Sequence, residues 1–214
     1  TADGKLIGIF GEKRRIPVSL EDLPDCLAQA FIASEDARFY EHPGVDYQGL
    51  TRAAWSLLTT GEKSIGGSTI TQQLARNFFL TTEKTFTRKI KEIFLALRIE
   101  RELEKNQILE LYMNKIFLGY RAYGVGAAAE VYYGKSPDQL SLAQCAMIAA
   151  LPKAPSRINP ITAPERAVER RDYVLGRMLE LGYVDRAGFE TAIRETDRAF
   201  YHGAIADISA PYVA

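Results

Sequence analysis

The sequence predicts a mainly α-helical fold with short extended segments at both termini. Two observations carry this prediction. Apolar residues recur every three or four positions through most of the chain, which is typical of amphipathic helices. Capping residues and Gly or Pro breaks separate these periodic segments at the places expected of helix ends. With 214 residues, 47% apolar and 25% charged, the chain has the composition of a soluble globular domain.

The overall charge identifies no class of binding partner. Lys and Arg total 27, and so do Asp and Glu, so the chain lacks the basic excess typical of nucleic-acid binding. It contains no signal peptide and no run of about 18 apolar residues. The chain begins without Met and ends in an interrupted strand-like stretch, so we expect an excised fragment of a longer protein.

The first 18 residues are predicted to be extended, with short strands at 5–10 and 14–18. A helix follows, in which Leu27, Phe31 and Glu35 share one face. Glu35 therefore continues an apolar stripe, and burial there would raise its carboxyl pKa and suit it to act as a general base. The alternative is an acid at a helix end that pairs with Arg38. On spacing alone, this alternative is slightly favoured.

The next part of the chain predicts a mobile loop that leads into a capped helix. A helix from Tyr47 ends at Gly61, and a Gly-rich loop occupies 61–67. Thr69 and Gln72 then have the spacing of a capping box. A Gly-rich loop before a helix N-terminus favours anion binding. The alternative is an ordinary capped helix with amides on its solvent face.

The longest predicted helix spans about 82–104 and has two distinct faces. Its core stripe is expected to contain Phe86, Ile90, Ile93, Phe94 and Leu97. Another face places Lys84 and Arg88 one turn apart ahead of Glu92, and these cations should hold Glu92 ionised. Two carboxylates with opposite pKa shifts often divide acid and base roles. The alternative is an ordinary ion-paired helix face.

Further helices are predicted up to the end of the domain, the first of them capped by Asn106, with extended chain from 198 onward. The two cysteines, Cys26 and Cys145, each lie in a predicted apolar helix. We favour buried free thiols, and a single disulfide stays open. Neither cysteine has the spacing of a metal site.

Five motifs stand in order between about Pro17 and Tyr183. They are Glu35-Asp36-x-x-Phe39-x-x-His42-x-Gly44, Gly67-Ser68-Thr69-x-x-Gln72-Gln73-x-x-Arg76-Asn77, Arg88-Lys89-x-x-Glu92, Lys105-x-x-Ile108-Leu109-Glu110-x-Tyr112-x-Asn114 and Arg170-x-x-x-Val174-Leu175. Together they make the chain resemble the glycosyltransferase domain of class A penicillin-binding proteins, the peptidoglycan glycosyltransferases of family 51. The presence of all five motifs in this order leaves very little probability of a chance match. The family often has Lys where Arg76 stands, which keeps the charge.

The resemblance implies a lysozyme-like, two-lobed helical glycosyltransferase domain over 19–197. Its small membrane-facing lobe would span roughly 45–80. Residues 1–18 would be an N-terminal extended linker, and 198–214 would begin a linker towards a transpeptidase domain absent from this sequence. The protein would then lie at the cell inner membrane, on its periplasmic or extracytoplasmic side. A transmembrane helix outside this fragment would anchor it.

The implied reaction polymerises lipid II into β-1,4-linked glycan, with inversion at MurNAc C1 and release of undecaprenyl pyrophosphate. By resemblance, Glu35 is the catalytic base, and Glu92 orients the cations at the donor site. Asp36 and His42 are supporting residues. The implied substrate-binding residues are Ser68, Thr69, Gln72, Gln73, Arg76, Asn77, Lys84, Arg88, Lys89, Glu110 and Asn114. The implied lipid contacts are Trp55, Phe78, Phe79 and Leu80, with packing between lobes as the alternative.

The implied partners are lipid II, the lipid-linked glycan chain, the cytoplasmic membrane and phosphoglycolipid inhibitors of the moenomycin type. No nucleic acid is expected. No cofactor is expected to be required, and a divalent cation such as Mg²⁺ near Glu92 stays open. One rival function is a lysozyme-like hydrolase or lytic transglycosylase, which has no need of a cationic leaving-group site. A second rival is a non-catalytic glycan- or lipid-binding module, for which two carboxylates would be superfluous.

Overall fold

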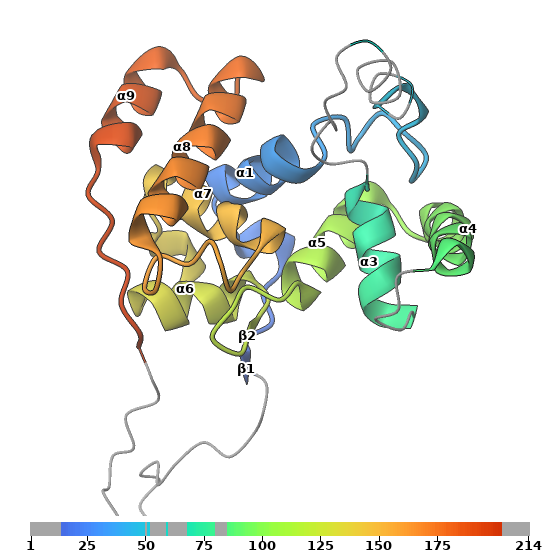
Figure 1. Cartoon of the computed structure of the whole chain (residues 1–214), viewed down its shortest axis with the longest axis horizontal. Helices are drawn as coiled ribbons and strands as arrows, with labels where there is room; N and C mark the ends of the chain where they lie inside the picture. Colours follow the sequence, from blue (N-terminus) through green and yellow to red (C-terminus); the bar gives the residue numbers. More distant parts are fainter. Residues whose placement is uncertain (1–13, 50, 52–58, 60–67, 80–84, 203–214) are drawn as a thin grey trace, which may run out of the picture.

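The computed structural model describes residues 14–49, 51, 59, 68–79 and 85–202. The predicted mainly α fold is confirmed. Figure 1 shows α3 and α4 on one side of α5, and α1 and α6 to α9 on the other, so α5 joins two groups of helices. The described elements, in chain order, are β1 (Arg14–Arg15), η1 (Leu20–Asp22), α1 (Asp25–Glu35), α3 (Ile70–Phe79), α4 (Phe86–Glu102), α5 (Lys105–Lys115), β2 (Ala122–Tyr123), α6 (Val125–Tyr133), η2 (Pro137–Gln139), α7 (Leu142–Ala150), η3 (Leu151–Lys153), α8 (Pro164–Glu180) and α9 (Arg186–Arg194).

The core of the larger group forms where α1 packs against α7 and α8. Leu27 and Phe31 of α1 are fully buried there, as their spacing predicted. The Ala-rich helices α6 and α7 are buried along nearly their whole length, since small side chains let neighbouring helices approach closely. None of the described helices is long and apolar enough to cross a membrane. The rigid packing of α1 fixes the position of Glu35 at its C-terminal end.

Cys26 and Cys145 form a disulfide between α1 and α7, so the preference for free thiols was wrong. The direct packing of the two helices brings the Cα atoms to 6.0 Å, which is within the usual range for a disulfide. The sequence could not show this, because the two cysteines lie 119 residues apart. The bond therefore covalently ties the Glu35 helix to the core.

Helix α4 presents the opposite face to the one predicted. Phe86, Phe94 and Ile90 are 94%, 68% and 55% exposed, whereas Glu92 and Ala96 are buried. The face of α4 that packs against the rest of the protein is the ion-paired face. Glu92 can be buried there because neighbouring cations neutralise it, and the small side chain of Ala96 lets other parts of the protein approach α4 closely. Three of the five residues expected in the core stripe instead form an exposed apolar face, and the other two, Ile93 and Leu97, are half-buried. We call Phe86, Ile90 and Phe94 the α4 apolar stripe.

Several predicted boundaries differ from the structure. Of the predicted strand at 14–18, only Arg14–Arg15 forms a strand, β1, which pairs in parallel with β2, Arg14 with Ala122. Helix α5 starts at Lys105, with a capping box formed by Glu104 and Gln107. The predicted cap, Asn106, is already inside the helix. The predictions for 5–10 and for the loop at 61–67 fall outside the described residues.

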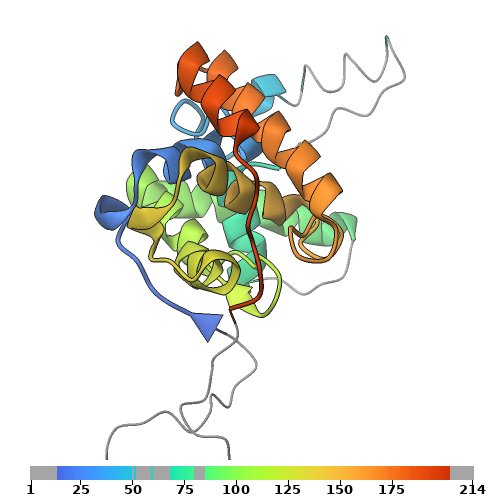
Figure 2. The ribbon, with the colours of Figure 1, turned by 90° about the vertical axis from the view of Figure 1, so that its left-hand side faces the viewer.

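The two ends of the described chain meet beside α6. Figure 2 shows the segment after α9 running down the molecule towards β1. The backbone N–H groups of Phe200 and His202 donate to Tyr132 O and Val131 O at 3.1 and 2.9 Å. Arg14 Nη1 donates to the carbonyl of His202 at 3.2 Å. The N-terminal strand and the C-terminal segment are therefore hydrogen-bonded to each other at one pole of the fold.

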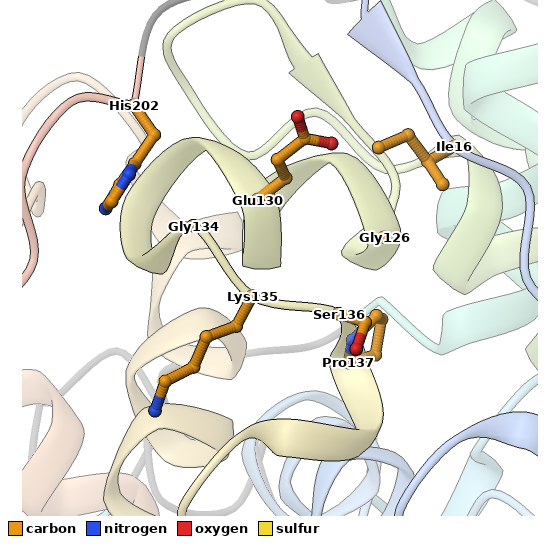
Figure 3. Close-up of a pocket in the computed structure, with 8 residues that line it drawn as sticks. All are labelled: Ile16, Gly126, Glu130, Gly134, Lys135, Ser136, Pro137 and His202. Carbon is orange, nitrogen blue, oxygen red and sulfur yellow. The ribbon is translucent and has the colours of Figure 1, made fainter.

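A cavity of about 440 Å³ lies at this pole. Figure 3 shows that the charged groups of Glu130 and Lys135, two of its lining residues, point away from each other. Gly134, with φ +61°, leaves room for His202, whose ring would lie 2.6 Å from an added Cβ. The charges do not converge as they would around a bound ligand. The lining consists of Ile16, Gly126, Glu130, Gly134, Lys135, Ser136, Pro137 and His202.

Candidate active site

Glu35 ends α1 as a partly buried carboxylate. Its Oε2 accepts a hydrogen bond from Gln73 Nε2 at 2.9 Å, and Gln73 Oε1 accepts one from the buried Tyr112 hydroxyl at 3.2 Å. Burial raises the pKa of Glu35, and the charge of Asp36 acts in the same direction. The Gln73 hydrogen bond and the charges of Arg170 and Arg76 oppose the rise. The predicted direction of the shift is confirmed.

The alternative for Glu35, a pair with Arg38, is wrong. The Arg38 guanidinium pairs with Asp46 and Gln48 instead. Arg38 Nη1 also lies 3.8 Å from the exposed Glu41 carboxylate. Glu35 is therefore left without a direct ion pair among the described residues, which is the condition under which a carboxylate keeps a raised pKa.

Asp36 and His42 connect the end of α1 to the start of α3. The backbone N–H of Ile70 donates to Asp36 Oδ2 at 3.0 Å, and His42 Nε2 lies 2.9 Å from Asp36 Oδ1. The N–H of Gly44 donates to His42 Nδ1 at 3.1 Å. Because Nδ1 accepts, the ring proton resides on Nε2 and is donated to Asp36. The pair thus positions α3, and with it Gln73, against Glu35.

The start of α3 has the predicted capping box. Gln72 Oε1 accepts from Thr69 N, and Thr69 Oγ1 accepts from Gln72 N, both at 3.1 Å. The Thr69 hydroxyl donates to Gly44 O at 2.6 Å. Gly44 has a φ of +89°, which glycine adopts without strain, and a side chain at this position would collide with Ala96 O. Most N–H groups at this helix start already have protein partners. Anion binding would therefore depend on cationic side chains more than on the helix N-terminus.

The buried Glu92 is the centre of an ionic cluster between α3 and α4, in which Arg88 and Lys89 are partly exposed. Its oxygens accept from Arg88 Nη1 at 3.0 Å and from Lys89 Nζ at 2.5 Å. Lys89 Nζ also donates to Ser68 Oγ at 3.0 Å and approaches Gln72 Oε1 at 3.4 Å. Two cations face one carboxylate, so the cluster carries a positive charge. A buried carboxylate requires such pairing.

The cluster does not fit a divalent cation. Both oxygens of Glu92 already accept hydrogen bonds from cations. In the part of the chain that the structure describes, no three His, Cys, Asp or Glu side chains are grouped to hold a metal ion. Mg²⁺ requires several oxygen ligands in near-octahedral geometry. The residues present supply hydrogen-bond donors in place of such ligands.

The predicted lipid contacts are only partly described. Phe78 is exposed at the end of α3, with Lys115 Nζ 4.3 Å from its ring centroid. Trp55, Leu80 and the side chain of Phe79 lie outside the described residues, as does Lys84 of the predicted substrate set. Lipid contact at these positions stays a prediction.

Comparison with known proteins identifies the family. The family profile described as Transglycosylase matches residues 3–179. The chain belongs to this transglycosylase family. It is 58% identical over its whole length to penicillin-binding protein 1A of Escherichia coli (strain K12) and 58% identical over 99% of its length to that of Vibrio cholerae serotype O1. It spans about a quarter of these relatives, 25% and 26%.

A solved structure supports the same assignment. The crystal structure of penicillin-binding protein 1A from Haemophilus influenzae is similar, with a TM-score of 0.59 and 36% sequence identity. The similarity covers 99% of this chain and 22% of that one. The transglycosylase fold therefore extends across the chain, in agreement with the resemblance carried by the five motifs.

Two residues of the predicted substrate set have structural partners in this transglycosylase domain. Asn114 exchanges two hydrogen bonds with the backbone of Val18, at 2.9 and 2.8 Å. Glu110 Oε2 accepts from the backbone N–H of Leu20 at 2.8 Å. These bonds hold the N-terminal segment against α5. They account for both polar side chains without a substrate, so substrate binding by Glu110 and Asn114 stays a prediction.

Sequence reasoning assigned no role to two residues near the candidate site. Arg170 of α8 interacts electrostatically with Glu35. Lys105 Nζ donates to His42 O at 2.6 Å and to Glu100 Oε1 at 2.8 Å, and lies 4.5 Å from the ring centroid of Phe39. Both stood inside the recognised motifs. Only the folded structure shows which carboxylate or carbonyl each one approaches.

Proposed function

We propose that this transglycosylase domain is a peptidoglycan glycosyltransferase that polymerises lipid II into β-1,4-linked glycan strands. One observation carries the proposal. A partly buried Glu35 with a raised pKa lies across α3 from a cluster in which two cations face one carboxylate. A base and a separate cationic group are what transfer of a sugar from a pyrophosphate requires. The names of the relatives, penicillin-binding protein 1A, agree with it.

In the proposed reaction, Glu35 removes the proton from the 4-hydroxyl of the acceptor GlcNAc. The hydroxyl oxygen attacks C1 of the donor MurNAc from the face opposite the pyrophosphate. The bond between C1 and the pyrophosphate oxygen breaks, and undecaprenyl pyrophosphate leaves with the electron pair. The α-linkage of the donor becomes β-1,4. The raised pKa of Glu35 makes its carboxylate a stronger base than an ordinary one near neutral pH.

The leaving pyrophosphate would be stabilised by Arg76, Arg88, Lys89 and the undescribed Lys84. Arg88 and Lys89 are held in place by Glu92, which neutralises only one of their two charges. Preorganised cations stabilise developing negative charge without reorganisation in the transition state. We propose that these cations serve the leaving group without a required cofactor. The same cations would bind the phosphate of phosphoglycolipid inhibitors of the moenomycin type.

The rival function, hydrolysis of glycan, predicts a different product. A hydrolase would cleave polymeric peptidoglycan and would gain nothing from the cluster around Glu92. Incubation of the protein with lipid II, and separately with polymeric peptidoglycan, distinguishes the two. We expect longer lipid-linked glycan from lipid II and no soluble fragments from the polymer. Cleavage of the polymer without chain growth would contradict the proposal.

Replacing Glu35 by Gln tests the proposed base. We expect Glu35→Gln to reduce the rate of glycan formation at least about a hundredfold, in line with the contribution of a general base. The fold should survive, because the amide oxygen of the substituted side chain can still accept the hydrogen bond from Gln73. The measurement is the initial rate of polymer formation, and circular dichroism monitors the fold. Exposed Glu41→Gln is the matched control, and a near-normal rate in Glu35→Gln would remove the residue from this role.

We further propose that the domain acts at the extracytoplasmic surface of the cytoplasmic membrane, where its lipid-linked substrate resides. The support is the α4 apolar stripe of Phe86, Ile90 and Phe94, which is exposed on a helix that also bears exposed basic residues such as Lys91 and Arg98. Apolar and basic side chains on one helix favour contact with an anionic lipid surface.

A further inference from the structure

We propose that a groove along α1 is a docking site for a basic segment of a partner protein, which inserts an arginine or lysine side chain into it. We call it the α1 groove. It has a volume of about 320 Å³ and lies where η1, α1 and the start of α5 meet. Its lining includes neither Glu35 nor Glu92, so it is separate from the candidate active site. The inference therefore goes beyond the proposed glycosyltransferase function.

The floor of the α1 groove is apolar. Leu109 is fully buried, and Leu23 and Ile32 are 9% and 4% exposed. The volume is at the lower end of the range for ligand pockets, so the groove suits one or two side chains better than a large cofactor. The methylene groups of a long basic side chain would pack on these residues while its charged end stays near solvent.

Two tyrosines also line the α1 groove. Tyr40 is 53% exposed, and Tyr183 is half-buried. The hydroxyl of Tyr40 donates to Asn106 Oδ1 at 3.0 Å, which fixes the ring at the edge of the groove. A guanidinium or ammonium group over the face of such a ring is stabilised by about 0.5–1 kcal/mol at an exposed site. Aromatic rings beside an apolar floor therefore favour a basic side chain with an apolar stem.

The charge at the α1 groove is negative. Asp25 lines it, and Glu21 and Asp22 belong to η1, whose first residue is also part of the lining. All three carboxylates are exposed and make no ion pair or hydrogen bond with the described part of the chain. Lys105, the neighbour of the lining residue Asn106, has its Nζ bonded elsewhere. Complementary charge on a partner must therefore be positive.

The same charge distinguishes the α1 groove from a membrane contact. Anionic lipid attracts basic surfaces, as on α4 with its exposed Lys91 and Arg98, and three unpaired carboxylates would be repelled by it. The groove also presents polar groups that suit a peptide backbone. The side-chain amide of Gln29 and the Nδ2 of Asn106 make no hydrogen bond with any described residue. The occupant that fits these features is a protein segment.

Hydrogen bonds within the protein hold the α1 groove in shape. Glu110 Oε2 accepts from the backbone N–H of Leu20 at 2.8 Å, which fixes η1 against α5. The bond from Tyr40 to Asn106 fixes the opposite side. Binding to a preformed groove costs less ordering entropy than binding to a mobile surface. This explains how a small groove could contribute to the docking of a partner.

A pair of peptides tests the inference on the 214-residue chain. The probe is acetyl-Leu-Arg-Leu-Arg amide, and its counterpart has citrulline, which resembles arginine in shape and lacks the charge, in both arginine positions. Binding is measured by nuclear magnetic resonance from the shifts of backbone amide signals. We expect the largest shifts at Gln29, Ile32 and Leu109. The citrulline peptide should bind about tenfold more weakly, because it loses the attraction to the carboxylates and to the tyrosine rings.

Variants of the protein then identify the charge that is responsible. Asp25→Asn should weaken binding of the arginine peptide about threefold to fivefold and leave binding of the citrulline peptide unchanged. Asp138→Asn, which removes an exposed carboxylate of η2 outside the α1 groove, is the matched control and should change neither affinity. Ala28→Phe should fill the groove and abolish binding of both peptides, with circular dichroism as the check on the fold.

Three results would overturn the inference. They are equal affinity for the two peptides, equal effects of Asp25→Asn and Asp138→Asn, and shifts at the groove amides caused by vesicles of anionic lipid but not by the arginine peptide. The last result would assign the groove to the membrane. Since binding is measured directly, the outcome is independent of whether the protein polymerises lipid II.

Discussion

At the scale of the residue, Glu35 is held where a carboxylate is poorly solvated. The single direct hydrogen bond that it accepts from a described side chain comes from Gln73, and Gln73 is in turn fixed by Tyr112. Its burial could be predicted, because Leu27 and Phe31 precede it by eight and four positions on the same helix face. Its electrostatic interaction with Arg170 could not be predicted, because no local pattern connects α1 to α8.

The raised pKa of Glu35 has a consequence for stability. A carboxyl group whose pKa is higher in the folded state than in the unfolded state stabilises the fold below the unfolded pKa, and this contribution is lost as the pH rises through the folded pKa. Glu35→Gln, which mimics the protonated group, should therefore be more stable than the unchanged protein at pH 7. The difference should vanish below about pH 4. Urea unfolding at several pH values measures it, and a less stable variant at pH 7 would contradict the assignment.

At the scale of the element, α4 shows the limit of periodicity. The apolar spacing correctly predicts a helix there, and the spacing from Arg88 to Glu92 correctly predicts an ion-paired face. Residue spacing does not reveal which face of α4 is buried against the rest of the protein. Burial of an ionic face is tolerated here because Arg88 and Lys89 satisfy both oxygens of Glu92. In contrast, the α3 capping box was predictable, since Thr69 and Gln72 interact within one turn.

The α4 apolar stripe should bind lipid without supporting the fold. Phe94→Gln should weaken binding to vesicles that contain anionic lipid by about tenfold, since a buried Phe contributes about 1.5–3 kcal/mol. Its free energy of unfolding should change by less than about 0.5 kcal/mol, because Phe94 is mostly exposed. Vesicle sedimentation measures the binding. Phe200→Gln is the control, as another exposed aromatic position, and equal binding by both variants would argue against a membrane role for α4.

At the scale of the whole molecule, long-range connections determine what the sequence alone leaves open. The order of the five motifs was enough to predict the family and the mainly helical fold. The pairing of Cys26 with Cys145, the parallel contact of β1 with β2 and the approach of α8 to α1 all join distant segments. Each depends on how the helices pack. A single sequence contains no local signal for such contacts.

The disulfide between α1 and α7 should contribute to global stability. Reduction of the Cys26–Cys145 bond should lower the free energy of unfolding by about 2–4 kcal/mol, because the bond closes a long loop in the unfolded chain. Thermal unfolding with and without a reductant measures the loss. A double variant, Cys26→Ala with Cys145→Ala, should not respond to the reductant. Two free thiols in the non-reduced protein, counted by alkylation and mass spectrometry, would contradict the pairing.

The hydrogen bond from Arg14 to the carbonyl of His202 also has a mechanical consequence. Tension applied between these two residues would act first on this contact, on the β1–β2 pair and on the bonds from Phe200 and His202 to α6. Helices α1 and α3, which hold Glu35 and Gln73, lie outside that path. A pull on the two ends of the described chain would therefore strain one pole of the fold and leave the spacing between the proposed base and its neighbours unchanged.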